Sequence, residues 1–85
     1  MKRIHKLKID KGFLESKLIG DKLFEIRCND RGYQKGDEVH YTDYQLDKIH
    51  LHKYQITYVI GYMQHDNYVV FGERFIETET IKGRA

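Results

Sequence analysis

The run GDKLFEIRCNDR, residues 20–31, holds the side chains of this sequence that are best suited to chemistry. Apolar and polar residues alternate through its middle, which is the pattern of a strand that buries one face. We expect the apolar face to enter the core and the ionic face to point into a shared concavity. The inward set would be Phe24, Ile26 and Cys28, and the outward set Glu25, Arg27 and Asn29.

The outward face combines cations with hydrogen-bonding groups, as a nucleotide site requires. Lys22 and Arg31 lie at the two ends of the strand, with Arg27 between them. Arginine binds phosphate through two parallel hydrogen bonds, and Glu25 and Asn29 are able to read the polar edge of a base. The alternative is a solvated strand face, on which a Glu–Arg pair contributes little to stability.

Four residues of this run also resemble a family signature. Gly20-x-Lys22-x-x-Glu25-x-Arg27 is similar to the motif of the ASCH domain, a branch of the PUA-like fold. The motif is short, so its specificity depends on what surrounds it.

Three further segments, at residues 5–9, 29–31 and 36–37, strengthen the resemblance. Their order and spacing are similar to those of a small uncharacterised ASCH-like family of bacteria and phages, over about residues 4–76. The resemblance implies a β-barrel with helices packed at its side, and a cleft where the motif meets the first strand. It also implies RNA binding, since ASCH domains are generally proposed to bind RNA.

The resemblance assigns binding roles residue by residue. The RNA or nucleotide would contact Lys22, Glu25 and Arg27 first. Weaker candidates are His5, Lys8, Asn29, Asp30, Arg31 and Asp37.

Some ASCH relatives are nucleases or hydrolyse modified nucleosides, which makes a small RNA-processing or nucleoside hydrolase the main alternative. Hydrolytic relatives use a threonine three residues after the motif lysine, where this sequence has Glu25. A carboxylate is able to act as a general base but does not replace a hydroxyl nucleophile. If the protein is an enzyme, the catalytic candidates are Glu25, Lys22 and His5. A protein-interaction module is the third possibility.

The histidines suggest at most a weak metal site. His50 and His52 would point the same way on a strand, with His40 or His65 as a third ligand. No cysteine pair or His-Glu helix motif supports such a site, so we expect no metal and no cofactor. His5 is different, because it lies in a segment of the resemblance. There it would act as a proton donor or a base-stacking group, with a structural hydrogen bond as the alternative.

Seven tyrosines raise the question of base stacking. Tyr54, Tyr58 and Tyr62 share one face of a predicted strand with isoleucines, and we expect that face in the core. Tyr33, beside the basic turn, and Tyr41 are the better stacking candidates.

The elements that position these residues can be predicted from periodicity. Asp10 is a helix cap, Gly20 ends the helix, and the helix would bury Phe13, Leu14 and Leu18. The predicted strands are residues 3–9, 22–31, 38–45, 53–63 and 68–76. We also expect a helix at about 11–19, an irregular segment at 46–52, a turn at 64–67 and a bulge at Gly72.

This order predicts an α+β fold that is mainly β: a small PUA-like barrel of five to six strands with one or two short helices at its side. We expect one domain over residues 1–78 and a polar tail over 79–85. The 85 residues carry a net charge of +2, which permits nucleic acid without requiring it. A single cysteine and no apolar run favour a cytoplasmic protein without a membrane partner.

Overall fold

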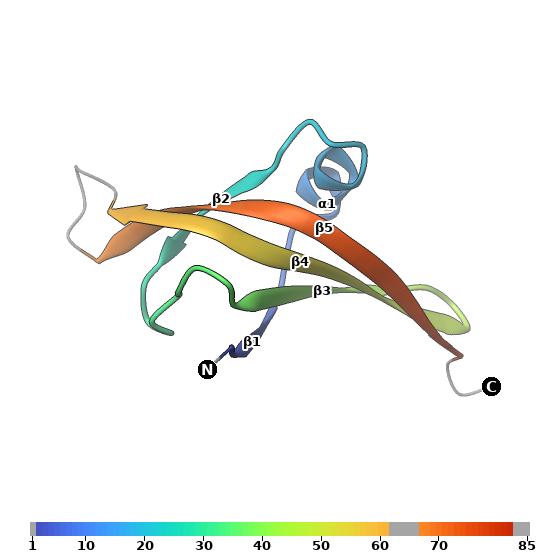
Figure 1. Ribbon diagram of the computed structural model, residues 1–85. Helices are drawn as coiled ribbons and strands as arrows, with labels where there is room; N and C mark the ends of the chain where they lie inside the picture. The colour runs from blue at the N-terminus through green and yellow to red at the C-terminus, as the bar shows by residue number, and fades with distance from the viewer. Residues whose placement is uncertain (1, 62–66, 83–85) are drawn as a thin grey trace.

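The computed structural model describes residues 2–61 and 67–82. Five strands form one sheet in the order β1-β3-β4-β5-β2, and one helix packs against it (Figure 1). The elements are β1 (Ile4–Leu7), α1 (Lys11–Leu18), β2 (Phe24–Cys28), β3 (Glu38–Tyr44), β4 (Lys48–Gly61) and β5 (Tyr68–Lys82). The predicted mainly-β, α+β fold class is confirmed.

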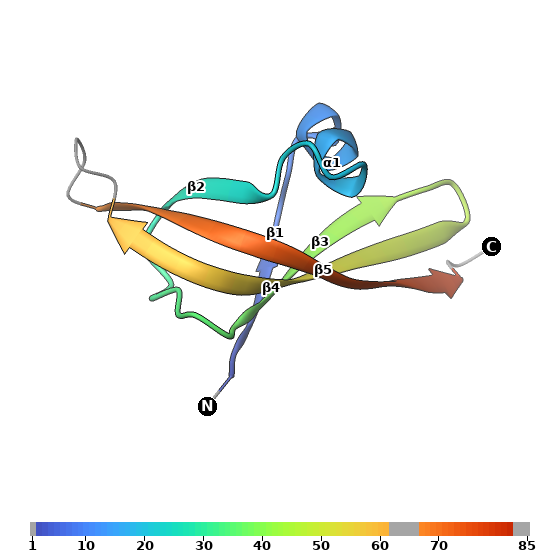
Figure 2. The ribbon, with the colours of Figure 1, turned by 45° about the horizontal axis from the view of Figure 1, so that its top comes forward.

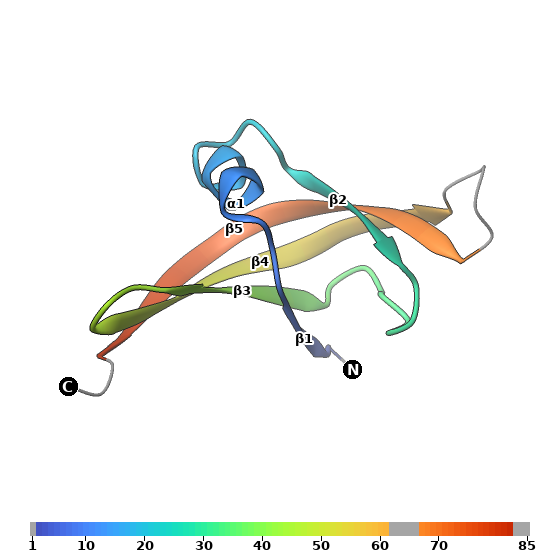
Figure 3. The ribbon, with the colours of Figure 1, turned by 180° about the vertical axis from the view of Figure 1, so that it is seen from behind.

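The sheet curls into a half-barrel, with β1 and β2 as its two edges (Figures 1 and 2). The β1–β3 pair is parallel and the other pairs are antiparallel. Seen from behind, α1 and β1 lie in front of β4 and β5, on the concave side (Figure 3). Arginines bridge the seam between the edges, because Arg27 Nη2 donates to Lys8 O at 2.9 Å and Arg31 Nη1 donates to Lys6 O at 3.2 Å.

The concave face holds the core. Its centre is aromatic, with the Tyr41 and Tyr54 rings in edge contact at 5.8 Å. Three ionic side chains are buried beside it. The apolar core consists of Leu7, Leu14, Tyr33, Val39, Tyr41, Tyr54, Ile56, Val69 and Phe71, and the ionic side chains are Lys17, Glu25 and Glu73.

The helix has the predicted ends but not the predicted buried face. Asp10 caps it by accepting a hydrogen bond from Gly12 N, and Gly20 follows with a φ of 88°. Its buried side chains are Leu14 and Lys17. Phe13 is 56% and Leu18 42% exposed, so the predicted core face was right for Leu14 and wrong for Phe13 and Leu18. Lys17 points inward because it pairs with the buried carboxylates of Glu25 and Glu73.

Strand β2 has the predicted alternation with its faces reversed. Glu25 is 4% exposed, whereas Phe24 is 42% and Ile26 is 46% exposed. Cys28, expected on the inner face, is also exposed. The buried partners of Glu25 come from other elements, so the pattern of β2 alone assigns its faces incorrectly.

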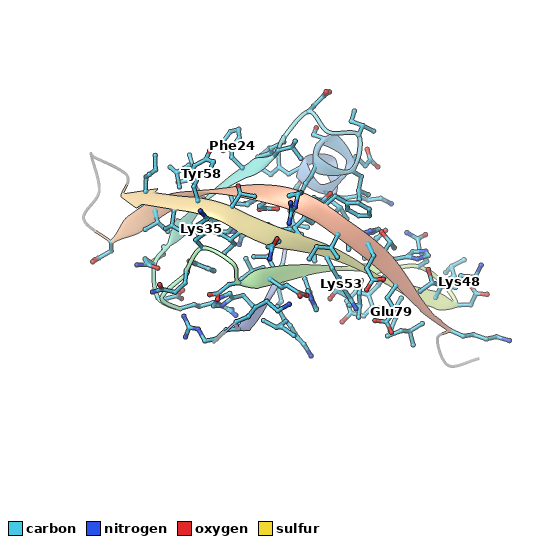
Figure 4. All side chains as sticks on the ribbon, viewed as in Figure 1. Phe24, Lys35, Lys48, Lys53, Tyr58 and Glu79 are labelled. Carbon is cyan, nitrogen blue, oxygen red and sulfur yellow. The ribbon has the colours of Figure 1, made fainter. Side chains whose placement is uncertain are left out.

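A bulge in β4 divides the predicted tyrosine face. Ile56 pairs with Glu73 but Tyr58 pairs with Gly72, which leaves Thr57 as an extra residue and turns the following side chains to the convex face. Tyr54 is therefore buried and Tyr58 is exposed. Figure 4 shows Tyr58 close to Phe24, and both pair with Gly72.

The hairpin of β4 and β5 is longer than the sequence predicted. Residues 48–52, expected to be irregular, belong to β4, and β5 continues to Lys82 through most of the predicted tail. The ion pair of Lys53 Nζ with Glu79 Oε1, at 2.9 Å, crosses this extension (Figure 4). Tyr62, His65 and most of the predicted turn at 64–67 lie outside the described residues.

No helix in the described part of the chain has the length and apolar character needed to cross a membrane.

The packing of Tyr58 on Gly72 gives a first prediction. A Cβ at Gly72 would lie 2.0 Å from Tyr58 Cε1, so Gly72→Ala should lower the free energy of unfolding by about 1–3 kcal/mol in urea melts. In a Tyr58→Ala background the same change should be neutral or stabilising, because alanine restricts the unfolded chain. An equal loss in both backgrounds would contradict the bulge register.

Candidate functional site

A lysine buried between two glutamates organises the interior beside β2. Lys17 Nζ lies 3.1 Å from Glu25 Oε1 and 3.1 Å from Glu73 Oε2, and its side chain is fully buried. The ammonium also lies 5.2 Å from the Tyr41 ring centroid and 5.5 Å from that of Tyr54. The lysine therefore has both ionic and cation–π partners.

Three elements bring these groups together. Lys17 follows the buried Leu14 by three residues, so both lie on the same face of α1. Glu25 pairs with Phe71 across β2 and β5, which makes Glu73 its diagonal neighbour on the same face of the sheet. The helix thus lays its ammonium over two carboxylates of adjacent strands.

The two glutamates differ in their affinity for a proton. Burial alone would raise the pKa of both. At Glu25, Lys17 and Lys22 outweigh burial and hold the pKa below its ordinary value. At Glu73, burial outweighs Lys17 and raises the pKa. Tyr41 donates its hydroxyl to Glu73 Oε1 at 2.5 Å, and burial beside this carboxylate raises the tyrosine pKa, so the hydroxyl stays a donor.

Glu25 also joins the buried cluster to the surface. Lys22 Nζ lies 3.0 Å from its Oε1, and Arg27 Nε donates to its Oε2 at 3.2 Å. Arg27 at the same time reaches Lys8 O across the seam. The structure therefore brings Lys22, Glu25 and Arg27 together as the sequence predicted, although through an inward-facing Glu25 rather than an outward one.

A cleft of about 450 Å³ lies along the free edge of β2. Lys22 Nζ lies 4.8 Å from the Phe13 ring centroid and 5.5 Å from that of Phe24. The cleft walls come from the segment after β1, from α1 and from β2. The lining residues are Lys8, Ile9, Asp10, Phe13, Lys22, Phe24, Glu25, Ile26 and Arg27.

These walls suit a ligand that has both a flat ring and a negative charge. Two partly exposed phenylalanine rings offer stacking surfaces, and three cations offer hydrogen bonds to an anion. Because the pKa of Glu25 is lowered, its carboxylate acts as an acceptor only. A ligand that reaches it would have to present a hydrogen-bond donor.

His5, a predicted binding residue, lies instead in a separate buried pair. Its Nε2 is 2.8 Å from Asp37 Oδ2, and the carboxylate also accepts from the backbone N–H groups of Arg3 and Gln34, each at 3.1 Å. The His5 ring lies 4.7 Å from the Tyr33 ring. This arrangement ties β1 to the loop before β3 and leaves His5 off the cleft wall.

The turn residues have structural contacts as well. Asn29 Oδ1 accepts from Tyr33 N at 3.1 Å, and Arg31 donates to Lys6 O. Asp30 is exposed. Of the described residues that line the cleft, none comes from this turn, while Lys8 does line it.

Both tyrosines predicted to stack on bases are buried. Tyr33 is part of the core, and Tyr41 is closed off among Tyr54, Lys17 and Glu73. Their expected role in base stacking was therefore wrong. Both side chains point into the concave core rather than to solvent, which sequence position alone does not reveal.

His50 and His52 point the same way, as predicted, and their ring centroids lie 6.0 Å apart. His50 Nδ1 pairs with Thr80 Oγ1 at 2.9 Å, and His52 Nδ1 pairs with Thr78 Oγ1 at 2.8 Å. The Nδ1 atoms of the two rings are thus engaged by threonines of β5. Over residues 2–61 and 67–82, no group of three or more His, Cys, Asp or Glu side chains is able to hold a metal.

The sequence interpretation missed Lys17 and Glu73, and it assigned the cleft residues Phe13 and Phe24 to the core. Lys17 and Glu73 each had a usable signal. Lys17 is charged at a position that helical spacing from Leu14 places on the buried face. Glu73 continues the inward alternation of Val69 and Phe71. A charge that interrupts an apolar period indicates a buried partner elsewhere.

The ion cluster gives a second prediction. Lys17→Met should lower the free energy of unfolding by about 3–5 kcal/mol, since it leaves two carboxylates buried without their shared cation. Adding Glu73→Gln should recover at least about 1 kcal/mol in urea melts, because Glu25 keeps Lys22 and Arg27. If the losses of Lys17→Met and of Glu73→Gln, each measured alone, simply add in the double variant, the two residues do not share an interaction.

The buried Asp37 gives a third prediction, on pH. Burial would raise its pKa, but hydrogen bonds from His5, Arg3 N and Gln34 N hold the pKa below its ordinary value of 3.8. The ionised group thus stabilises the fold above that pH, and the contribution is lost as pH falls toward the native pKa.

Asp37→Asn should therefore flatten the acid limb of the free energy of unfolding, measured by urea melts between about pH 6 and pH 3. Asp47→Asn, at an exposed carboxylate in the β3–β4 turn, is the matched control and should leave the limb unchanged. Curves for Asp37→Asn that run parallel to wild type would refute the role of this carboxylate.

Residues 4–73 match the family model described as a domain of unknown function, DUF3850, and the chain belongs to this family. No curated protein matches the sequence.

Proposed function

We propose that this protein binds RNA or a nucleotide in the cleft beside β2. The observation that carries the proposal is the position of Lys22 between the exposed rings of Phe13 and Phe24, on a wall that also holds Arg27. A nucleotide is a flat base joined to a phosphate, and this wall offers partners for both parts.

The proposed roles follow from the geometry. A base would stack on the ring of Phe13 or Phe24, where the Lys22 ammonium now lies, and the ammonium would move to the phosphate. Arg27 and Lys8 would hold phosphate oxygens at the seam. Glu25, kept ionised by its lysine partners, would accept a hydrogen bond from a base amino group.

Resemblance to ASCH domains of the PUA-like fold supports the same proposal. The motif residues all line the cleft, where the Glu25 carboxylate pairs with both Lys22 and Arg27. The cytoplasm, which a single free cysteine favours, is a compartment where RNA is present.

The site favours binding over hydrolysis. A general base works best when its pKa is close to the working pH, and the lysines around Glu25 lower its pKa instead. His5, the other acid–base candidate, is buried against Asp37. Glu73 has a raised pKa but a fully buried side chain.

A binding assay with single-stranded RNA pools tests the proposal and gives the fourth prediction. Arg27→Ala should weaken RNA retention on filters about 10- to 100-fold, as expected for a lost charge-assisted contact, and should reduce the salt dependence of binding by about one phosphate contact. Arg74→Ala removes an exposed arginine on the convex face, outside the cleft lining, and is the matched control.

The proposal fails if wild type retains no more RNA than a charge-matched control protein does, or if Arg27→Ala and Arg74→Ala have equal effects. Incubation of the protein with labelled RNA and acylated nucleosides completes the test. Turnover abolished by Glu25→Gln would make the hydrolase the better assignment. Thermal melts confirm that each variant is folded.

A further inference from the structure

A second hollow lies directly beside the cleft. Its volume is about 480 Å³, and it shares Lys8 and Ile9 with the cleft, so these residues form a ridge between the two spaces. Its lining residues are Lys6, Leu7, Lys8, Ile9, Thr42 and Tyr44.

The alternation of β1 and β3 explains which side chains reach this hollow. His5 and Leu7 are buried, whereas Lys6 of β1 and Lys8, directly after the strand, are exposed. On β3, Tyr41 is buried and Tyr44 is exposed. Since Leu7 pairs with Tyr41, the part of β3 that carries Tyr44 extends beyond the end of β1.

Tyr44 contributes little to the core, because 75% of its surface is exposed. Tyr44 nevertheless belongs to the regular strand β3, which fixes the position of its backbone. Among the described residues that line the hollow, there are two lysines and no acidic side chain. The cleft, by contrast, includes the carboxylates of Asp10 and Glu25.

We propose that this hollow is a second base subsite, in which Tyr44 stacks on the nucleotide adjacent to the one in the cleft. This inference rests on the proposed function. Lys8 on the ridge, with Lys6 beside it, would contact the phosphate that joins the two nucleotides. The ligand is then a single strand of at least two nucleotides rather than a mononucleotide or a duplex, since stacking on both rings requires unpaired bases.

Affinity as a function of chain length tests the proposal. Fluorescence anisotropy competition with AMP, 5′-phosphorylated diadenylate and tetra-adenylate would be measured for wild type, Tyr44→Ala, Tyr44→Phe and Leu46→Ala. Leu46 is fully exposed in the same hairpin, does not line either space, and is the matched control.

Wild type should bind diadenylate at least about 5-fold more tightly than AMP, the size of one base stacked on an aromatic ring. Tyr44→Ala should remove this gain and leave AMP affinity unchanged, whereas Tyr44→Phe and Leu46→Ala should keep it.

The inference would be overturned, with the proposed function left in place, by no gain from AMP to diadenylate in wild type or by a gain that survives Tyr44→Ala. A Tyr44→Ala variant that loses AMP and diadenylate affinity equally would also overturn it, because the ring would then act on the first site. Absence of binding to every probe would sink the proposed function and the second subsite together.

Discussion

The contact of the Lys17 ammonium with two buried carboxylates is the constraint on which the rest of this structure depends. An ammonium without solvent requires anionic partners, and Glu25 and Glu73 supply them from neighbouring strands. Helix α1 must therefore lie over the β2–β5 pair, and β2 must turn its carboxylate inward. Such a buried cluster adds little net stability over an apolar one, but it is costly to break, so its main effect is to fix positions.

The position of the cleft follows from this constraint. With Glu25 turned inward, its free lone pairs attract Lys22 and Arg27 to the edge of β2. The apolar residues Phe24 and Ile26 then have to face outward, where Phe24 forms part of the cleft wall. Arg27 continues to the carbonyl of Lys8 and helps to hold the two edges of the half-barrel together. One carboxylate thus links the core, the seam and the proposed ligand site.

Much of this arrangement was predictable from local pattern. The helix was predicted within one residue of its observed ends because Asp10 and Gly20 act through their own backbone neighbours. The alternation in β2 was also correct, and so was the grouping of Lys22 with Glu25 and Arg27. These features depend on residues close in sequence.

The errors concern faces, and they share a physical cause. Hydrophobicity indicates which face of a strand should be buried only when the charges on the other face lack buried partners. The partners of Glu25 include Lys17 on the helix and, through it, Glu73 on β5, which neighbours β2 in the sheet but is distant in sequence. Tyr58 was misplaced because the Thr57 bulge inverts the alternation midway through β4. Pairing between distant segments decides both outcomes.

The most direct test of the shared cation is a carboxyl ¹³C NMR titration of the wild-type protein. Glu25 should titrate below the ordinary glutamate value of 4.5 and Glu73 above it, since Lys17 and Lys22 oppose burial at the first and burial prevails at the second. Two glutamates that both titrate above 4.5 would show that no buried cation offsets burial at Glu25, and two that titrate together near 4.5 would show that Glu73 is not buried with it.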